Sequence, residues 1–348
     1  MINACTFMTR RCPRNCSYCD ASKVKKDDEL DRLDWLQVND ILYKMGVDFN
    51  LILGNETWLL GDNLNKIMET NKVPYALYTT CPPILFERYK DKFFTGNIDN
   101  LSCGIDYSHS YLIDKQLEEY DDMEMKSAHA WLGLAETRKK YPHVDCQGTV
   151  TLHKQNYYQL PEIVRGLSEL GIFVGVNVIH HNKDGDFDFF PKKEFLNEFL
   201  FTEAHVRKLQ KIFLETVAIE GALIQNKEML MNPILVKHMV RTDWHCRGNP
   251  YDGPTIDSDG SLRCCGYRKG RYASQFTIFE MPKLFPNYMK AVYDDAMECP
   301  GCFWSYPVMF HYWENHSPKF GKRVFANHAR PELDESKWSK RRTDGNTD

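Results

Sequence analysis

Short apolar segments alternate with longer segments of helical periodicity over the first 180 residues. Apolar or β-branched segments of about four to eight residues are typical of strands buried in a parallel sheet. Such segments predict strands at residues 2–8, 49–53, 74–79, 101–106, 147–152 and 172–179.

The intervening segments predict helices at residues 34–46, 62–72, 84–91, 118–140 and 157–170. In the last of these, apolar residues recur at the i, i+3, i+4, i+7 spacing of one helix face, at Leu160, Ile163, Val164 and Leu167. This alternation predicts an α/β fold with a parallel sheet and right-handed crossovers. A doubly wound sheet and a partial (β/α)6 barrel both fit, and both place the chemistry at the carboxyl ends of the strands.

The pattern changes after residue 190. Helical periodicity predicts helices at 191–200, 203–220 and 227–240, whereas residues 244–305 are rich in Gly, Pro, Cys and aromatic residues. That region contains a hairpin signal, PTIDSDGSLRC, which turns at Asp259-Gly260. We therefore expect a core at 1–190, a helical connector at 191–243, a small metal-stapled module at 244–317 and a weakly periodic tail at 318–348.

Composition and charge narrow the class of protein. The 348 residues contain no apolar run of the roughly 18 residues that a membrane span needs. The first residues, MINACTFMTRRC, lack the apolar stretch of a signal peptide, so we expect a cytoplasmic protein. The net charge of −4 is spread along the chain, and nothing in it demands nucleic acid as a partner.

The chain contains 12 cysteines, which in a reducing compartment indicate metal ligands more than disulfides. Cys12, Cys16 and Cys19 form a C-x3-C-x2-C motif in the loop that follows the first predicted strand. Thiolates select zinc or iron–sulfur clusters. A structural zinc site would need a distant His or Cys as its fourth ligand, whereas a 4Fe–4S cluster held by three cysteines leaves one iron free.

This motif, with Tyr18 just before its last cysteine, resembles the defining motif of the radical S-adenosylmethionine (SAM) superfamily. The segment LILGNET resembles the family's Gly-Gly-Glu motif, with Gly54 and Glu56 matching and Asn55 in place of the second glycine. The resemblance implies that a 4Fe–4S cluster on the three cysteines binds SAM and cleaves it to a 5′-deoxyadenosyl radical. It also implies a SAM contact for Tyr18 and for residues 54–56.

Further site residues follow from the resemblance by position. Strands four to six of the family contact SAM, which makes Ser102, Thr151, Asn156, Asn177 and Val178 candidate cofactor contacts; buried strand residues without a ligand are the alternative. Candidate catalytic groups at the strand ends are Asp106, Tyr107 and His153. Other polar side chains at these ends are His109, Cys103, Cys146, His180 and His181.

A second set of cysteines lies in the last third of the chain. The spacing of Cys246, Gly260, Cys265, Cys299 and Cys302 resembles the C-terminal extensions called twitch and SPASM, which carry auxiliary iron–sulfur clusters in radical SAM enzymes. The shorter twitch version implies one auxiliary 4Fe–4S cluster on Cys246, Cys265, Cys299 and Cys302. Cys264 is an alternative to Cys265, because adjacent strand residues face opposite ways. A four-cysteine zinc site is the other alternative.

We therefore expect an enzyme of oxidoreductase or isomerase type that abstracts a substrate hydrogen, with SAM, two 4Fe–4S clusters and an electron donor such as flavodoxin or ferredoxin. An auxiliary cluster fully ligated by cysteine favours oxidation or rearrangement. The substrate is a small molecule, as in a twitch-bearing aminocyclitol dehydrogenase, or a decorated nucleobase or other macromolecule. The early position of the motif argues mildly against a maturase of ribosomal peptides. A non-catalytic metal-binding or redox-sensing protein is the alternative from another class.

Overall fold

A computed structural model describes residues 2–19, 28–179, 196–246, 253–303 and 308. Its centre is an eight-stranded sheet with the strand order β6-β5-β4-β3-β2-β1-β7-β8. The predicted strands are confirmed as β1 (Ile2–Phe7), β2 (Val47–Leu53), β3 (Tyr75–Thr79), β4 (Ile98–Ile105), β5 (Asp145–Leu152) and β6 (Phe173–Val178). These six are parallel, and each lies beside its neighbour in sequence. The α/β prediction is therefore confirmed, with an open sheet rather than a closed barrel.

The C-terminal hairpin belongs to this same sheet. Its strands are β7 (Thr255–Ile256) and β8 (Leu262–Arg263), which pair antiparallel. β7 also pairs parallel with β1, with Cys5 opposite Thr255. The hairpin within the expected module at 244–317 thus belongs to the core sheet, while the module itself and the division into domains stay predictions.

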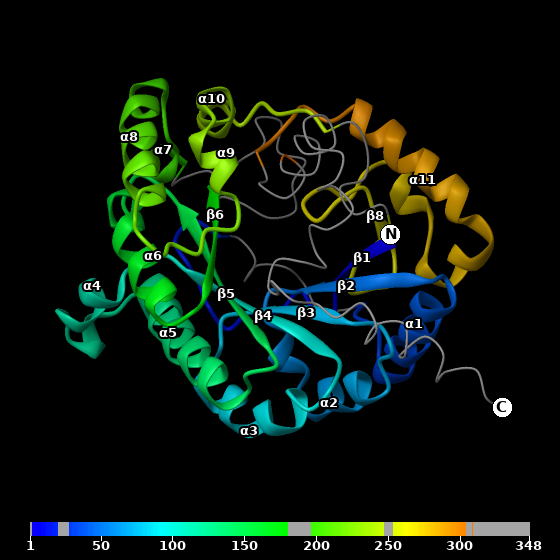
Figure 1. Ribbon diagram of the computed structural model, residues 1–348. Coiled ribbons are helices and arrows are strands. Elements are labelled where there is room, and N and C mark those ends of the chain that lie inside the picture. Colours follow the sequence, from blue (N-terminus) through cyan, green and yellow to red (C-terminus); the bar gives the residue numbers. More distant parts are fainter. Residues whose placement is uncertain (1, 20–27, 180–195, 247–252, 304–307, 309–348) are drawn as a thin grey trace.

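Helices cover the outside of the curved sheet (Figure 1). The predicted helices of the first half are confirmed as α1 (Arg32–Lys44), α2 (Asp62–Glu69), α3 (Pro83–Phe93), α5 (Asp122–Lys140) and α6 (Leu160–Glu169). α5 begins later than expected because Asp121 caps it, accepting hydrogen bonds from the backbone of Met123 and Glu124. A short helix that the pattern did not predict, α4 (His109–Ile113), follows β4.

The second half contains α7 (Leu196–Phe199), α8 (Val206–Val217), α9 (Lys227–Met231), α10 (Pro233–Arg241) and α11 (Met281–Met297). Sequence patterning missed α11, because two prolines fall in its first turns. It packs beside α1 and closes the outer layer next to the hairpin. Short 3-10 turns occupy Thr57–Leu60, Leu117–Glu119, Tyr157–Gln159, Glu203–His205, Ala273–Gln275 and Ile278–Glu280.

Aromatic side chains fill the core between the sheet and the outer helices. Trp58 is fully buried, and its ring centroid lies 4.9 Å from that of Phe93. Polar side chains also occur inside the sheet: Thr6 donates to Asn50 at 2.9 Å, and Ser102 and Thr149 are 2.8 Å apart. Burial of such groups is tolerated because they are hydrogen-bonded to each other. No described helix is long and apolar enough to span a membrane.

Candidate functional site

The three-cysteine loop (residues 8–19) begins where β1 ends and is fastened to the loop that follows β2. The backbone N–H groups of Asn55 and Glu56 donate to the carbonyls of Thr9 at 3.2 Å and Arg11 at 2.8 Å. The Asn55 side chain also donates to the Arg10 carbonyl. The residue that departs from the Gly-Gly-Glu pattern therefore holds the two loops together at the carboxyl ends of neighbouring strands.

The thiols of this loop lie close enough to influence one another. Burial raises the pKa of Cys12 to about 11 and that of Cys16 to about 12, and the Cys19 thiol adds to both shifts. These soft donors suit an iron–sulfur cluster, and they would release protons on binding it. Among the described residues, no three His, Cys, Asp or Glu side chains are placed to hold a single metal ion.

Glu56 lies within electrostatic range of Cys12 and is completely buried. Its carboxylate accepts hydrogen bonds from the Thr79 hydroxyl at 2.8 Å and from the Thr80 backbone N–H at 2.7 Å. Burial raises its pKa, and the bonds from Thr80 and Thr79 partly offset that rise. Gly54 is required here by close packing, because a Cβ at that position would lie 2.7 Å from the Thr57 hydroxyl oxygen.

Asp106, at the end of β4, belongs to a buried network of three side chains. Lys126 on α5 pairs with its carboxylate at 2.5 Å, and the Tyr18 hydroxyl donates to the same carboxylate at 3.1 Å. Lys126 also donates to the Tyr18 hydroxyl at 2.8 Å. The predicted residues Asp106 and Tyr18 are thus brought together, and Lys126, which sequence analysis missed, joins them.

His153 and Asn156 lie at the end of β5, beside that network. The Asn156 side-chain amide donates to the backbone carbonyls of Asp106 at 2.9 Å and Thr151 at 3.0 Å. The Asn156 side-chain oxygen accepts from the backbone N–H of His153 at 2.8 Å. Burial lowers the pKa of His153 to about 4, so its ring is neutral at pH 7. Its Nε2 is buried without a hydrogen-bond partner among the described residues. Asn156 ties two strand ends together, while His153 keeps one ring nitrogen available.

The other predicted residues are less tightly grouped. Tyr107 points toward α4, where its ring stacks on Tyr111 with centroids 5.0 Å apart. Thr151 and Asn177 are opposite each other on β5 and β6, and both are half-buried. Val178 is buried. His180 and His181 lie outside the described residues.

The second cysteine set is assembled from three separate segments. Trp244 pairs with Cys302 through two backbone hydrogen bonds of 2.8 and 3.0 Å. This pairing places the segment that contains Cys246 next to the segment that contains Cys302. Burial raises the pKa of Cys246, with further contributions from Cys265 and Cys299. Cys265 and Cys299 therefore both lie within electrostatic range of Cys246. The buried Cys264 thiol lies 3.8 Å from the Val292 carbonyl, and it also hydrogen-bonds to the Cys265 thiol.

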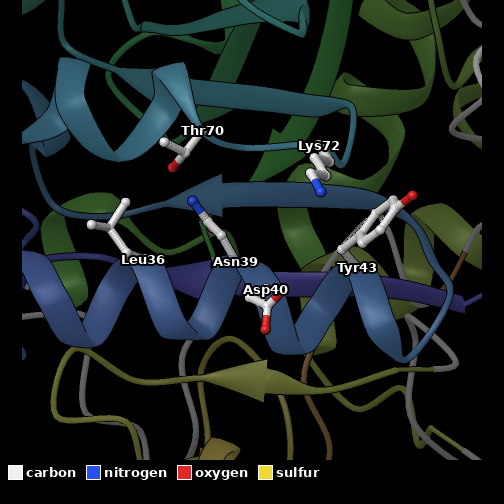
Figure 2. Close-up of a pocket in the computed structure, with 6 residues that line it drawn as sticks. All are labelled: Leu36, Asn39, Asp40, Tyr43, Thr70 and Lys72. Carbon is white, nitrogen blue, oxygen red and sulfur yellow. The ribbon is translucent and has the colours of Figure 1, made fainter. Parts of the chain in front are cut away.

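A surface pocket of about 290 Å³ lies elsewhere, between α1 and the chain that leads into β3 (Figure 2). Tyr43 precedes β2 and Lys72 precedes β3, so the pocket lies toward the amino ends of the strands. The Lys72 ammonium sits 4.8 Å from the centre of the Tyr43 ring. This pocket is separate from the three-cysteine loop.

Comparison with known proteins gives matches in structure alone. No protein-family model matches the chain, and neither does any curated protein. The structure of SuiB from Streptococcus suis bound to S-adenosylmethionine matches at a TM-score of 0.52 and 16% identity, over 75% of this chain and 59% of SuiB. Native anSMEcpe with bound AdoMet and Cp18Cys peptide matches at a TM-score of 0.55 and 16% identity, over 88% of this chain and 87% of that protein.

A third structure, SuiB bound to precursor peptide SuiA, matches at a TM-score of 0.54 and 15% identity, over 84% of this chain and 66% of SuiB. The chain thus spans about 59 to 66% of the length of SuiB in these two matches. At these identities the likeness concerns the fold. The chain shares its fold with these proteins, which were solved with S-adenosylmethionine or a peptide bound.

Proposed function

We propose that the chain is a radical SAM enzyme that binds a 4Fe–4S cluster through Cys12, Cys16 and Cys19. The observation that carries this proposal is the position of the three thiols: one loop at the carboxyl end of β1, fastened to the Gly54–Glu56 segment, in a fold shared with SAM-bound proteins. Such a cluster would supply the electron that cleaves SAM to methionine and a 5′-deoxyadenosyl radical, which takes a hydrogen atom from the substrate.

The chain's own residues would position the reactants and keep water out. Glu56 presents a buried carboxylate within electrostatic range of Cys12 as a partner for the amino group of SAM. His153 offers an unused ring nitrogen near Tyr18, with the two ring centroids 5.9 Å apart. Because Nδ1 accepts from the Gln155 backbone N–H at 3.3 Å, the neutral ring carries its proton on Nε2 and can donate one hydrogen bond there, which makes His153 our candidate for contact with substrate or cofactor.

We further propose an auxiliary 4Fe–4S cluster on Cys246, Cys265, Cys299 and Cys302. The electrostatic influence of Cys265 and Cys299 on Cys246 supports it, as does the backbone pairing that brings Cys302 near. The Cys264 thiol donates a hydrogen bond to Cys265, which lowers the pKa of Cys265 to about 7 and favours Cys265 as the thiolate ligand. Four cysteine ligands would leave no iron free for substrate, so this cluster would accept an electron during oxidation or rearrangement of the substrate.

The direct test is anaerobic reconstitution with iron and sulfide, followed by reduction with dithionite in the presence of SAM. We expect formation of 5′-deoxyadenosine and about eight irons per chain, the sum of two 4Fe–4S clusters. A protein that contains only zinc, or that forms no 5′-deoxyadenosine, would contradict the proposal. The Cys16→Ala variant is the matched control for nonspecific SAM breakdown.

The substrate class needs its own experiment. Two structural neighbours were solved with bound peptides, the Cp18Cys peptide and SuiA, which favours a peptide as a second candidate beside a small molecule. Deuterium transfer into 5′-deoxyadenosine from a panel of deuterated peptides, aminocyclitols and nucleosides would separate these classes. Deuterium from one class alone would identify the substrate class, and site-specific labels within that class would identify the carbon that loses hydrogen.

A further inference from the structure

Lys126 is a buried lysine at the base of the three-cysteine loop. Its side chain is 8% exposed, and its ammonium lies 2.5 Å from the Asp106 carboxylate and 2.8 Å from the Tyr18 hydroxyl. A charge buried this deeply costs free energy unless it is paired, so its presence calls for a role.

Both members of the ion pair contact the three-cysteine loop through the Tyr18 hydroxyl, the Lys126 ammonium at 2.8 Å and the Asp106 carboxylate at 3.1 Å. Tyr18, which contacts Lys126, lies between Cys16 and Cys19 in the loop. Lys126 influences both Cys12 and Cys16, and on Cys16 its influence exceeds that of Asp106. Burial opposes the charge on Lys126, but Asp106 and Tyr18 outweigh burial and raise its pKa well above the ordinary value. The ammonium is therefore charged at pH 7.

We propose that Lys126 is a positioning residue that holds a fixed positive charge against the cluster on Cys12, Cys16 and Cys19 and thereby raises its reduction potential. The inference rests on the proposed function, because it needs the cluster. A nearby cation stabilises the reduced cluster, which carries one more negative charge, and the low dielectric around Lys126 strengthens that effect. Its hydrogen bond to Tyr18 also fixes the segment between two of the cysteines.

Lys90 on α3 provides a matched control. It too is a buried lysine, with a side chain 5% exposed, paired with Glu87 at 2.7 Å and with Glu136. It has no contact with the three-cysteine loop in any described interaction. Replacing Lys90 therefore removes a paired, buried cation that does not contact the three-cysteine loop.

The experiment is an EPR-monitored potentiometric titration of the reconstituted protein and its variants. We expect K126Q to shift the midpoint potential of the SAM-binding cluster to a more negative value, while K126R and K90Q leave it near the wild-type value. We expect D106N, which leaves the Lys126 charge unopposed, to shift the potential the other way. Opposite signs for two members of one ion pair are a result that a merely structural role would not produce.

Three outcomes overturn the inference. Equal shifts in K126Q and K126R would show that charge is not the cause. If K126Q does not fold, a D106N potential equal to or below that of the wild type overturns it by itself. Wild-type protein that binds no cluster overturns the proposed function as well, and this result is distinguished from the others by iron and sulfide content.

Discussion

The two cysteine sets differ in how the chain brings them together. The three-cysteine loop places its thiols within eight consecutive residues and is held by backbone hydrogen bonds to the loop after β2. The second set draws Cys246, Cys265 and Cys299 from segments that are far apart in sequence. A local set is fixed by a short loop, whereas a dispersed set exists only once the surrounding packing is complete. We therefore expect the second set to depend more strongly on tertiary structure than the first.

A salt bridge connects the two regions. Asp257 in the hairpin accepts from Arg10 in the three-cysteine loop and from Arg263 beside Cys264, both at 2.6 Å. The Arg10 guanidinium also lies 4.1 Å from the centre of the Phe7 ring. This bridge joins the loop after β1 to the hairpin that extends the sheet at β1.

Cys16→Ala tests the three-cysteine loop and should have the largest effect on iron content and SAM cleavage. Two thiols do not hold a 4Fe–4S cluster that needs three, so we expect loss of about four irons per chain and loss of 5′-deoxyadenosine formation. Iron analysis and chromatography of the SAM products provide the measurement. Retention of 5′-deoxyadenosine formation in this variant would show that the loop is not the site of SAM cleavage.

Cys299→Ala tests the second cysteine set and should have a smaller effect on SAM cleavage. We expect it also to lose about four irons, but to keep part of the 5′-deoxyadenosine formation while product formation fails. The comparison with Cys16→Ala isolates the role of the second set, because each variant removes one thiol. Wild-type iron content and wild-type turnover in Cys299→Ala would rule out the auxiliary cluster.

Asp257→Asn breaks the connection between the two regions. It leaves two buried guanidinium groups with a neutral partner, which should cost about 3 to 5 kcal/mol of unfolding free energy at pH 7. The pKa of Asp257 is lowered, since its bonds to Arg10 and Arg263 outweigh burial. Its stabilisation is therefore complete above the pKa of an unfolded aspartate, near 4, and is lost as the pH falls below it.

The check for Asp257→Asn is urea unfolding of the wild type and the variant at several pH values. The difference in unfolding free energy should be constant between about pH 5 and 7 and should shrink below about pH 4. If the dispersed set depends on packing as we expect, this variant should also lose iron from the second set before the first. A difference that grows at low pH would contradict the assignment of the charge pair.

The sequence predicted the parts of this molecule that are local. The six parallel strands and the three-cysteine loop are each encoded within a few residues, and apolar runs or ligand spacing reveal them. Lys126 was missed because its role depends on Asp106 and Tyr18, which are distant in sequence. A signal was present: Lys126 lies three residues after Met123 and four before Ala130, on the buried face of α5.

The C-terminal region was harder for the same reason. The hairpin turn at Asp259-Gly260 was predicted from its residues, and Gly260 does have a positive φ of 79°. The pairing of β7 with β1 could not be predicted, since parallel pairing between strands about 250 residues apart leaves no local pattern. The position of Asn55 could be matched to a motif, but its bond to the Arg10 carbonyl required the fold.

Replacing Cys264 should have the smallest effect on stability, and comparing it with replacement of Cys265 tests which of the two thiols belongs to the second cysteine set. The Cys264 side chain is buried, and its thiol contacts the Val292 carbonyl, so Cys264→Ala should cost about 1 kcal/mol of unfolding free energy and keep the iron of both clusters. Cys265→Ala should lose the second cluster, because its thiol acts on Cys246. The two residues are adjacent and the substitutions identical, so iron content separates ligand from packing residue. Iron loss in Cys264→Ala with retention in Cys265→Ala would reverse the assignment.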